Sequence, residues 1–186
     1  MKITNYNRGF TVVELLVAIL MFSLVFGGAM NLLFSALRVQ RNALAQEHVL
    51  SQGSYLAEYM GRALRQARKE LAASPNNCLT TAGRGFNYEI NASADRIRFL
   101  NKDNRCQEFY LAGSAIQERI STNNVASNFG SPVALTSEDV AVGSLKFALA
   151  GETQADSIQP RATMFLQIND VQLQTSVSQR IFDVEQ

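Results

Sequence analysis

A long apolar segment near the N-terminus dominates the pattern of the chain. From Leu15 to Leu37 the sequence holds no charged residue and no proline. A segment of about 23 such residues forms a helix long enough to cross the roughly 30 Å hydrocarbon core of a bilayer. The pattern therefore predicts a transmembrane helix over residues 10–37, preceded by a polar leader, residues 1–9, that contains Lys2 and Arg8.

A second apolar pattern follows, at the spacing of a helix. Apolar residues recur at three, four or seven positions, which is typical of one buried helix face. They are Val49, Leu56, Met60, Leu64, Ala67 and Leu71. We therefore expect one nearly continuous helix from about Phe10 to Ala72, whose amphipathic half lies within residues 38–74 and ends at Ser74-Pro75-Asn76-Asn77. Its glycines are the places where it could bend: Gly27, Gly28, Gly53 and Gly61.

Beyond Pro75 the chain changes to short runs that are typical of β-strands, separated by turn residues. The expected strands are Phe86–Ile90, Arg96–Leu100, Glu108–Leu111, Ala115–Ile120, Leu145–Leu149, Ala162–Ile168 and Val171–Phe182. Thr122–Pro132 is polar and predicts a loop, and Asn169-Asp170 predicts a tight hairpin. The fold class expected is α+β: a long N-terminal helix, transmembrane and then amphipathic, packed on an antiparallel sheet head over residues 75–186.

One carboxylate, Glu14, lies where the apolar segment begins, just after Arg8-Gly9-Phe10-Thr11. An ionised group near the bilayer core costs roughly 2.5–3.5 kcal/mol on insertion scales, so it normally has a dedicated partner. An ordinary secretory signal, cut near Gly27-Gly28-Ala29, needs no carboxylate in its apolar middle. A plain membrane anchor leaves the cost of Glu14 unexplained.

The segment from Arg8 to Leu16 resembles the class III signal of the type IV pilin and pseudopilin family. The resemblance implies that a prepilin peptidase cleaves between Gly9 and Phe10, that Phe10 is N-methylated, and that Glu14 acts in assembly. It also implies a single-pass inner (cytoplasmic) membrane protein with an extracytoplasmic head, surrounded by lipid before assembly. Its partners would be other pilins or pseudopilins, contacted through the N-terminal helix, and an inner-membrane assembly platform.

Later motifs narrow the resemblance to minor pilins of the PilW type and J-type minor pseudopilins of type II secretion. These motifs are Leu64-Arg65-Gln66-Ala67-Arg68, the run Leu135–Val140, Leu145-Lys146-Phe147, Gln159-Pro160-Arg161 and the run Leu173–Arg180. A proline that kinks the stem of many major pilins is missing here. The resemblance therefore favours a minor subunit.

The two cysteines, Cys78 and Cys106, both follow the apolar segment. An even number of cysteines in an exported region suggests one disulfide, which would close a loop of about 28 residues. The alternative is two separate reduced thiols. No second Cys or His pair accompanies them, so we expect no zinc site.

Catalytic chemistry is not predicted anywhere in the chain. His48, the one histidine, has no Cys or Ser nucleophile spaced to use it. The acidic pair Glu138-Asp139 could bind calcium, but following Thr136 and Ser137 it is more typical of a turn or helix start. The sequence therefore predicts no enzyme, no metal site and no cofactor.

The charge pattern does not suggest nucleic-acid binding. The formal net charge is +1, and no basic patch is interleaved with aromatic residues. The one basic cluster is explained by a solvated helix face: Arg62, Arg65, Arg68 and Lys69.

Two function classes remain. The first is a minor pilin or pseudopilin that initiates or caps a type IV pilus or type II secretion pseudopilus. The second is a membrane-tethered extracytoplasmic binding module with no filament role.

Overall fold

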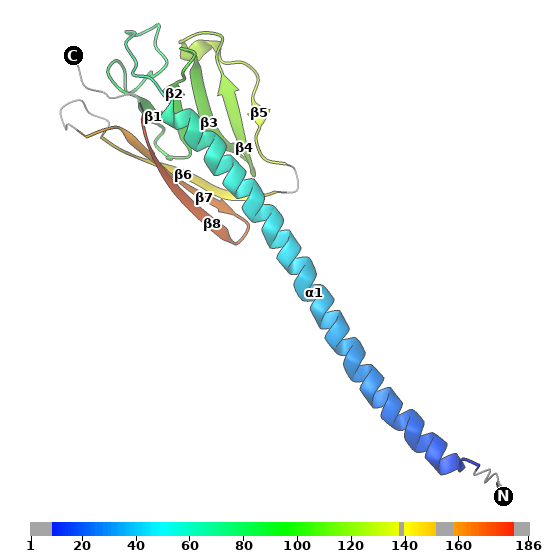
Figure 1. The fold of residues 1–186 in the computed structure, drawn as a ribbon. Helices are drawn as coiled ribbons and strands as arrows, with labels where there is room; N and C mark the ends of the chain where they lie inside the picture. The colour runs from blue at the N-terminus through cyan, green and yellow to red at the C-terminus, as the bar shows by residue number, and fades with distance from the viewer. Residues whose placement is uncertain (1–8, 138–139, 152–157, 181–186) are drawn as a thin grey trace, which may run out of the picture. The chain divides into compact units, whose positions relative to one another are not determined.

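The computed structural model describes residues 9–137, 140–151 and 158–180. It divides into two compact units that meet between Glu47 and His48. One helix, α1 (Val12–Arg65), runs through this boundary without interruption (Figure 1). We describe the two units separately and call the second one the head.

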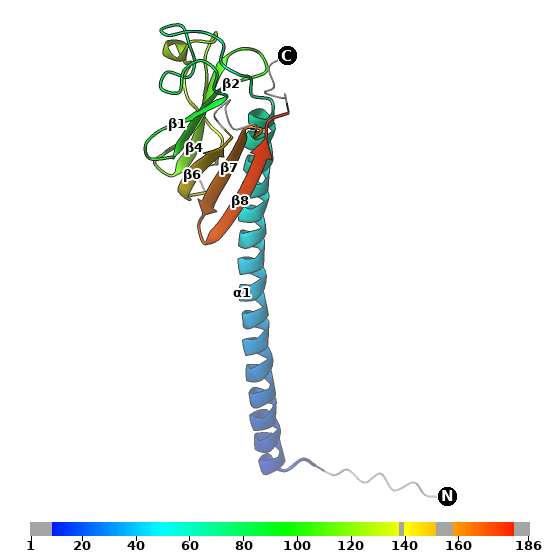
Figure 2. The same ribbon diagram turned by 90° about the vertical axis from the view of Figure 1, so that its left-hand side faces the viewer.

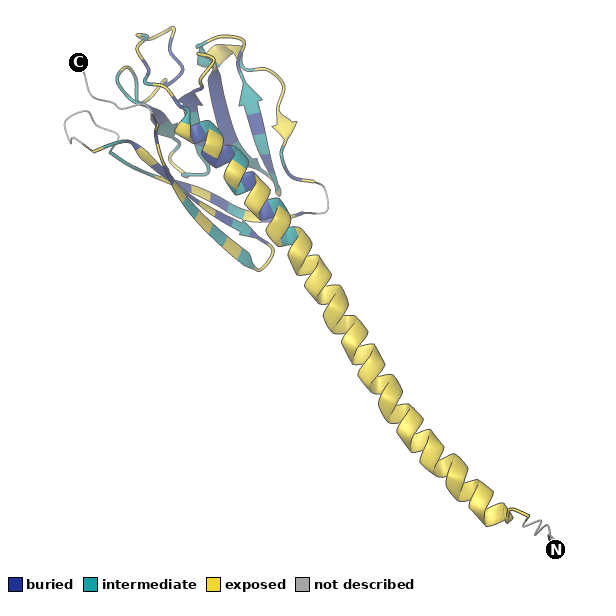
Figure 3. Ribbon diagram, in the orientation of Figure 1, coloured by how far each residue is buried: buried dark blue, intermediate teal, exposed yellow. Residues whose placement is uncertain are grey.

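The first unit consists of the N-terminal part of α1, whose residues are all exposed (Figure 3). No turn of this part is broken, because Gly27 and Gly28 lie in regular helix. A side chain built at either glycine would meet nothing within 4 Å. The apolar surface of this helix therefore lacks a protein partner among the described residues.

The head contains two antiparallel sheets and the last part of α1 (Figures 1 and 2). The first sheet has the strand order β1-β2-β3-β4-β5 and the second the order β6-β7-β8. The first five strands are β1 (Tyr88–Ile90), β2 (Arg96–Leu100), β3 (Cys106–Ala112), β4 (Ala115–Ile120) and β5 (Val133–Ala134). The last three are β6 (Val142–Ala150), β7 (Arg161–Ile168) and β8 (Val171–Ser178), and a short 3-10 helix, η1 (Ala126–Asn128), precedes β5.

One hydrophobic core joins the helix to both sheets. Leu56, Met60 and Leu64 of α1 are fully or almost fully buried. They belong to the same cluster as large side chains of the two sheets: Tyr88, Ile97, Phe99, Phe109, Ile116, Leu145, Phe147, Met164, Leu166, Ile168 and Val177. This helix segment therefore owes its burial to the strands, as expected for an amphipathic helix whose apolar face is covered.

The predicted fold class, a long apolar helix followed by antiparallel β-structure, is confirmed. Seven predicted strands are present, with Arg96–Leu100 and Ala115–Ile120 matching to the residue, and Asn169-Asp170 forms the predicted hairpin between β7 and β8. The strands form two sheets rather than one, and the short strand β5 was not predicted. Phe182, the predicted end of the last strand, lies outside the described residues.

The predicted end of the helix is wrong, because α1 stops at Arg65 rather than near Ala72. Two of its last carbonyls accept hydrogen bonds from other elements: the Tyr88 hydroxyl donates to Leu64 O at 2.7 Å, and the Arg180 N–H donates to Arg65 O at 2.9 Å. The chain then bends into an extended path, where Arg68 forms a bridge with Leu100. Leu71, predicted to be on the buried face, is 67% exposed.

Gly53 and Gly61, where α1 could bend or locally unwind, both lie in unbroken helix, so the helix does not unwind at either position. A Cβ at Gly53 would overlap Cδ1 of Leu173, and a Cβ at Gly61 would lie 3.2 Å from Cγ1 of Val177. These glycines therefore allow strand β8 to approach the helix closely.

Candidate functional site

The bond between Gly9 and Phe10 lies outside the helix. Gly9, Phe10 and Thr11 have no regular secondary structure, and α1 begins at Val12. All three residues are exposed, and a side chain at Gly9 would meet nothing within 4 Å. Backbone that is neither helical nor covered is open to an endopeptidase, so the geometry is suitable for cleavage at this bond.

Thr11 and Glu14 form a capping box at the start of α1. The Glu14 N–H donates to the Thr11 hydroxyl at 3.3 Å, and the Glu14 carboxylate accepts the Thr11 N–H at 3.1 Å and the Thr11 hydroxyl at 3.2 Å. This reciprocal arrangement satisfies N–H groups that have no partner within a helix. Glu14 therefore has a local partner in its own chain.

Sequence reasoning missed the role of Thr11. The signal was present, since Thr-x-x-Glu before an apolar run is the pattern of a capping box. The cost of an ionised group in lipid favoured instead a partner for Glu14 that carries a positive charge. The box also fixes where the helix starts, and this leaves the Gly9–Phe10 bond two residues outside it.

The helix surface that follows Glu14 is apolar on all sides. Leu16, Phe22 and Leu32 of this helix are 61%, 69% and 74% exposed. Among the described residues, α1 is the one helix long and apolar enough to cross a membrane. A helix that is apolar all round requires burial in lipid or among other helices.

Comparison with known families identifies this N-terminal segment. Residues 4–30 match the model of the prokaryotic N-terminal methylation motif. The chain carries this motif. The match includes the Gly9–Phe10 bond, the capping box and the first part of the apolar helix. It supports a type IV pilin-like subunit that is processed at its N-terminus and has a structural role, and with the apolar helix it supports single-pass membrane anchoring. No curated protein and no solved structure matches the chain.

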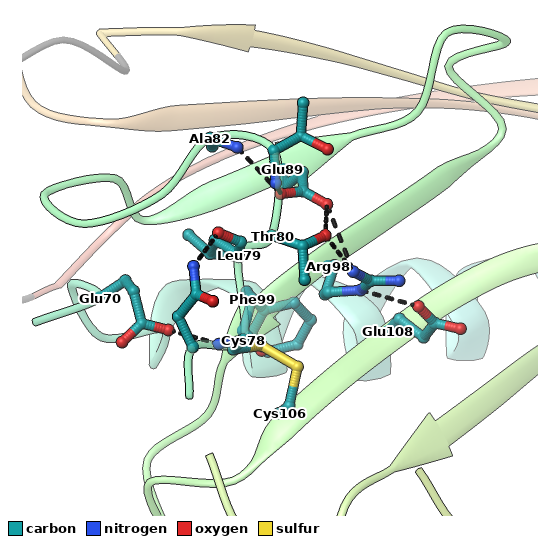
Figure 4. A network of polar contacts seen from close by, with 12 residues as sticks. Glu70, Cys78, Leu79, Thr80, Ala82, Glu89, Arg98, Phe99, Cys106 and Glu108 are labelled. Carbon is teal, nitrogen blue, oxygen red and sulfur yellow. Dashed lines mark hydrogen bonds and ion pairs between the residues drawn. A yellow bond between two sulfur atoms is a disulfide. The ribbon is translucent and has the colours of Figure 1, made fainter. Parts of the chain in front are cut away.

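The head holds the predicted disulfide between Cys78 and Cys106, whose Cα atoms lie 5.3 Å apart. Both residues are fully buried, and they pack with Leu79 and Leu100 in a second, smaller core. This core lies beside the segment that follows α1. The Glu70 carboxylate accepts hydrogen bonds there from the N–H groups of Ala72, at 2.9 Å, and Cys78, at 2.7 Å (Figure 4 shows the Cys78 contact).

A row of alternating charges crosses four strands of the first sheet: Glu89 on β1, Arg98 on β2, Glu108 on β3 and Arg119 on β4. These residues are direct cross-strand neighbours. Arg98 Nε donates to Glu108 at 3.0 Å, and Arg119 Nε donates to it at 2.9 Å (Figure 4 shows the Arg98 contact). The Glu108 side chain is fully buried.

Two loops close over this charge row. The Glu89 carboxylate accepts the Thr81 N–H at 2.6 Å and the Ala82 N–H at 3.0 Å. The Phe129 ring lies against both guanidinium groups, with its centroid 5.5 Å from Arg98 Cζ and 5.1 Å from Arg119 Cζ. Each carboxylate of the row faces a guanidinium, and the contacts of Glu89 and Phe129 attach the two loops to the sheet.

The other residues considered as candidates from the sequence are His48, the pair Glu138-Asp139 and the basic cluster. His48 is exposed on α1. The described part of the chain holds no group of three His, Cys, Asp or Glu residues that could bind a metal ion. Glu138 and Asp139 lie outside the described residues. Of the basic cluster, Arg62 and Arg65 are exposed on α1, but Arg68 and Lys69 lie beyond the end of the helix.

A buried polar contact links α1 to the first sheet. The Tyr59 hydroxyl lies 3.0 Å from both carboxylate oxygens of Glu118, and Gln107 Nε2 donates to the same carboxylate at 2.5 Å. Burial, followed by this hydrogen bond, raises the pKa of Tyr59 to about 12. Burial alone raises the pKa of Tyr88. The hydrogen bonds of the Tyr59 hydroxyl to Glu118 and of the Tyr88 hydroxyl to Leu64 O attach α1 to the sheet.

Proposed function

We propose that the chain is a minor pilin or pseudopilin that helps to initiate or cap a type IV pilus or a type II secretion pseudopilus. The observation that carries the proposal is the methylation motif at residues 4–30, together with the exposed apolar helix that begins within it at Val12. Residues 1–9 would be the cleaved leader, 10–37 the membrane and filament-core helix, and 38–65 the remainder of the stem helix, of which the part from His48 onward belongs to the head.

Processing would take place at the Gly9–Phe10 bond. A prepilin peptidase would cleave there, and Phe10 would become the new N-terminus and be methylated. The helix would then stay in the inner membrane with the head on the extracytoplasmic side, until an assembly platform transfers the subunit to other pilins. Exposure of the apolar helix on every side supports this transfer, because lipid and neighbouring helices can cover the same surface in turn.

Glu14 would direct assembly. Cleavage creates a positively charged α-amine at Phe10, shortly before Glu14 in the chain. Pairing of the two charges, within one chain or between neighbours, lowers the cost of keeping either in an apolar core, and it works in one axial register. Thr11 supports the carboxylate before a neighbour arrives.

The first test is the intact mass of the membrane-extracted protein. The proposal expects a chain that begins at Phe10 and carries one added methyl group. Gly9→Val should leave the leader attached, because a bulky side chain precedes the bond to be cut. Gly28→Val is the matched control, since it makes the same change where nothing lies within 4 Å, and it should be cleaved normally. A wild-type chain that keeps residues 1–9 would contradict the proposal and favour a tethered binding module.

The second test separates the charge of Glu14 from its capping role. Glu14→Gln keeps a capping box, which accepts Gln at this position, but removes the charge. Glu14→Ala removes both. Both variants should be cleaved normally. After crosslinking, fewer partner pilins should co-purify with either variant than with the wild type. Full recovery with Glu14→Gln would show that the cap, and not the charge, is what assembly requires.

A further inference from the structure

Strand β8 is a free edge of the second sheet. It pairs with β7 over all eight of its residues, from Val171 to Ser178, with no register shift. Along the opposite side of β8, no described residue forms a backbone hydrogen bond. A strand in this state presents unpaired N–H and C=O groups that can pair with another extended chain.

The other edge strands are either short, as β1 and β5 are, or hydrogen-bonded to loops, as β6 is. β1 has three residues and β5 has two. β6 is interrupted by a bulge between Val142 and Ser144, and its N–H groups bond to loops of the first sheet: Val142 N–H to Ser114 O at 2.9 Å, and Phe147 N–H to Ala94 O at 2.8 Å. β8 is therefore the long, regular edge among the described strands.

β8 also lacks the features by which edge strands avoid pairing. Its sequence, Val-Gln-Leu-Gln-Thr-Ser-Val-Ser, has no charge, no proline and no glycine. Lysine, proline or a bulge normally protects an exposed edge. β6 has both a bulge and an exposed Lys146. The contrast within one small sheet indicates that the β8 edge is kept available for a partner.

The packing of β8 on α1 restricts which partner can bind. Leu173 contacts the helix at Gly53 and Val177 contacts it at Gly61, so β8 runs parallel to the helix in the head. Two copies joined by antiparallel β8 strands would have their head helices pointing in opposite directions. Subunits whose head helices run in the same direction cannot pair in that way.

We propose that the β8 edge binds an extended segment of a sister subunit by strand addition. The inference rests on the proposed function, which brings sister subunits together along α1, the helix on which β8 packs. The segment that fits is uncharged, because β8 offers no charge for it to pair with. Its polar side chains would lie beside the exposed row of β8, namely Gln172, Gln174, Ser176 and Ser178.

The test uses the full-length chain in detergent, co-expressed with the chains that carry the same N-terminal motif. Gln174→Lys places a charge on the exposed face at the edge. Gln167→Lys is the matched control, because it makes the same substitution on central strand β7, where Gln167 pairs with Gln172. We expect Gln174→Lys to weaken sister-subunit binding about tenfold and Gln167→Lys to leave it within about twofold. The unfolding midpoints of both variants should match that of the wild type.

Hydrogen exchange provides the second readout. Alternate amides of β8 should exchange rapidly in the chain alone and become protected in the complex. Binding without this protection, or equal loss of binding in the two variants, would overturn strand addition and leave the proposed function standing. A photocrosslink from position 174 to a second copy of the chain would also overturn the inference. If no motif-bearing chain co-purifies with the wild type, both the inference and the proposed function fail.

Discussion

Leu173 of β8 packs onto Gly53 of α1 at the place where any other residue would carry its Cβ. Gly53→Val should therefore lower the free energy of unfolding by roughly 1–3 kcal/mol, the usual cost of overpacking a filled site. Urea unfolding of the purified chain measures this change. Ser54→Val, at the neighbouring exposed position, is the control for placing a β-branched residue in the helix and should cost under about 1 kcal/mol. Adding Leu173→Ala to Gly53→Val should recover part of the loss, and strictly additive effects would contradict this packing.

The buried charge row should be sensitive to loss of its central carboxylate. Glu108→Gln leaves Arg98 and Arg119 without their shared counter-ion, so we expect a loss of roughly 3 kcal/mol in unfolding free energy. Glu58→Gln is the matched control, because Glu58 pairs with Arg62 at 2.5 Å with both side chains about 70% exposed. That change should cost under about 0.5 kcal/mol. Similar losses in the two variants would show that burial does not strengthen the row.

Tyr59 should make the stability of the head fall at alkaline pH. Its pKa is raised from 10.0 to about 12, so the folded state holds this proton more tightly than the unfolded state. The resulting stabilisation is complete below pH 10 and is lost as the pH rises toward 12. Tyr59→Phe should reduce this decline, although Tyr88 contributes a decline in the same direction. Unfolding midpoints measured between pH 9 and pH 11.5 test it, and parallel curves for wild type and variant would contradict it.

The disulfide should contribute substantially to the stability of the head. Cys78 and Cys106 lie 28 positions apart, and a loop of this size corresponds to roughly 3–4 kcal/mol in the chain-entropy model. The double variant Cys78→Ser, Cys106→Ser should lose about this amount in urea unfolding. Wild-type protein that has been reduced and alkylated while unfolded is the comparison, and it should behave similarly. Non-reducing peptide mapping should recover the linked peptide, and free thiols at both positions would refute the pairing.

The spacing of apolar residues predicted the helix and its buried face, but not where the helix ends. The spacing of Leu56, Met60 and Leu64 identified the buried face of α1, and all three are buried. The same spacing failed at Leu71, because Tyr88 and Arg180 take up the carbonyls of the last turn. These partners are distant in sequence, and periodicity carries no information about them.

Among the residues of the candidate site and the charge row, some can be recognised in a short sequence motif and others depend on strand pairing. Gly9, Phe10 and Glu14 stand in a short motif, so they could be found by inspection, and Thr11 could have been found from the capping pattern. Glu108 could not have been found, because its arginine partners come from the register of β2, β3 and β4. A carboxylate in an alternating strand otherwise suggests an exposed position.

The end of α1 is closed by residues that are made much later. Arg65 O accepts its hydrogen bond from Arg180, and Ala67 O accepts one from Gln179, 112 positions further along the chain. During synthesis or export the helix therefore emerges long before these donors. A chain halted ahead of Gln179 would lack the donors that bond to Arg65 O and Ala67 O, so the head can reach its final form only after almost all of its residues have been delivered.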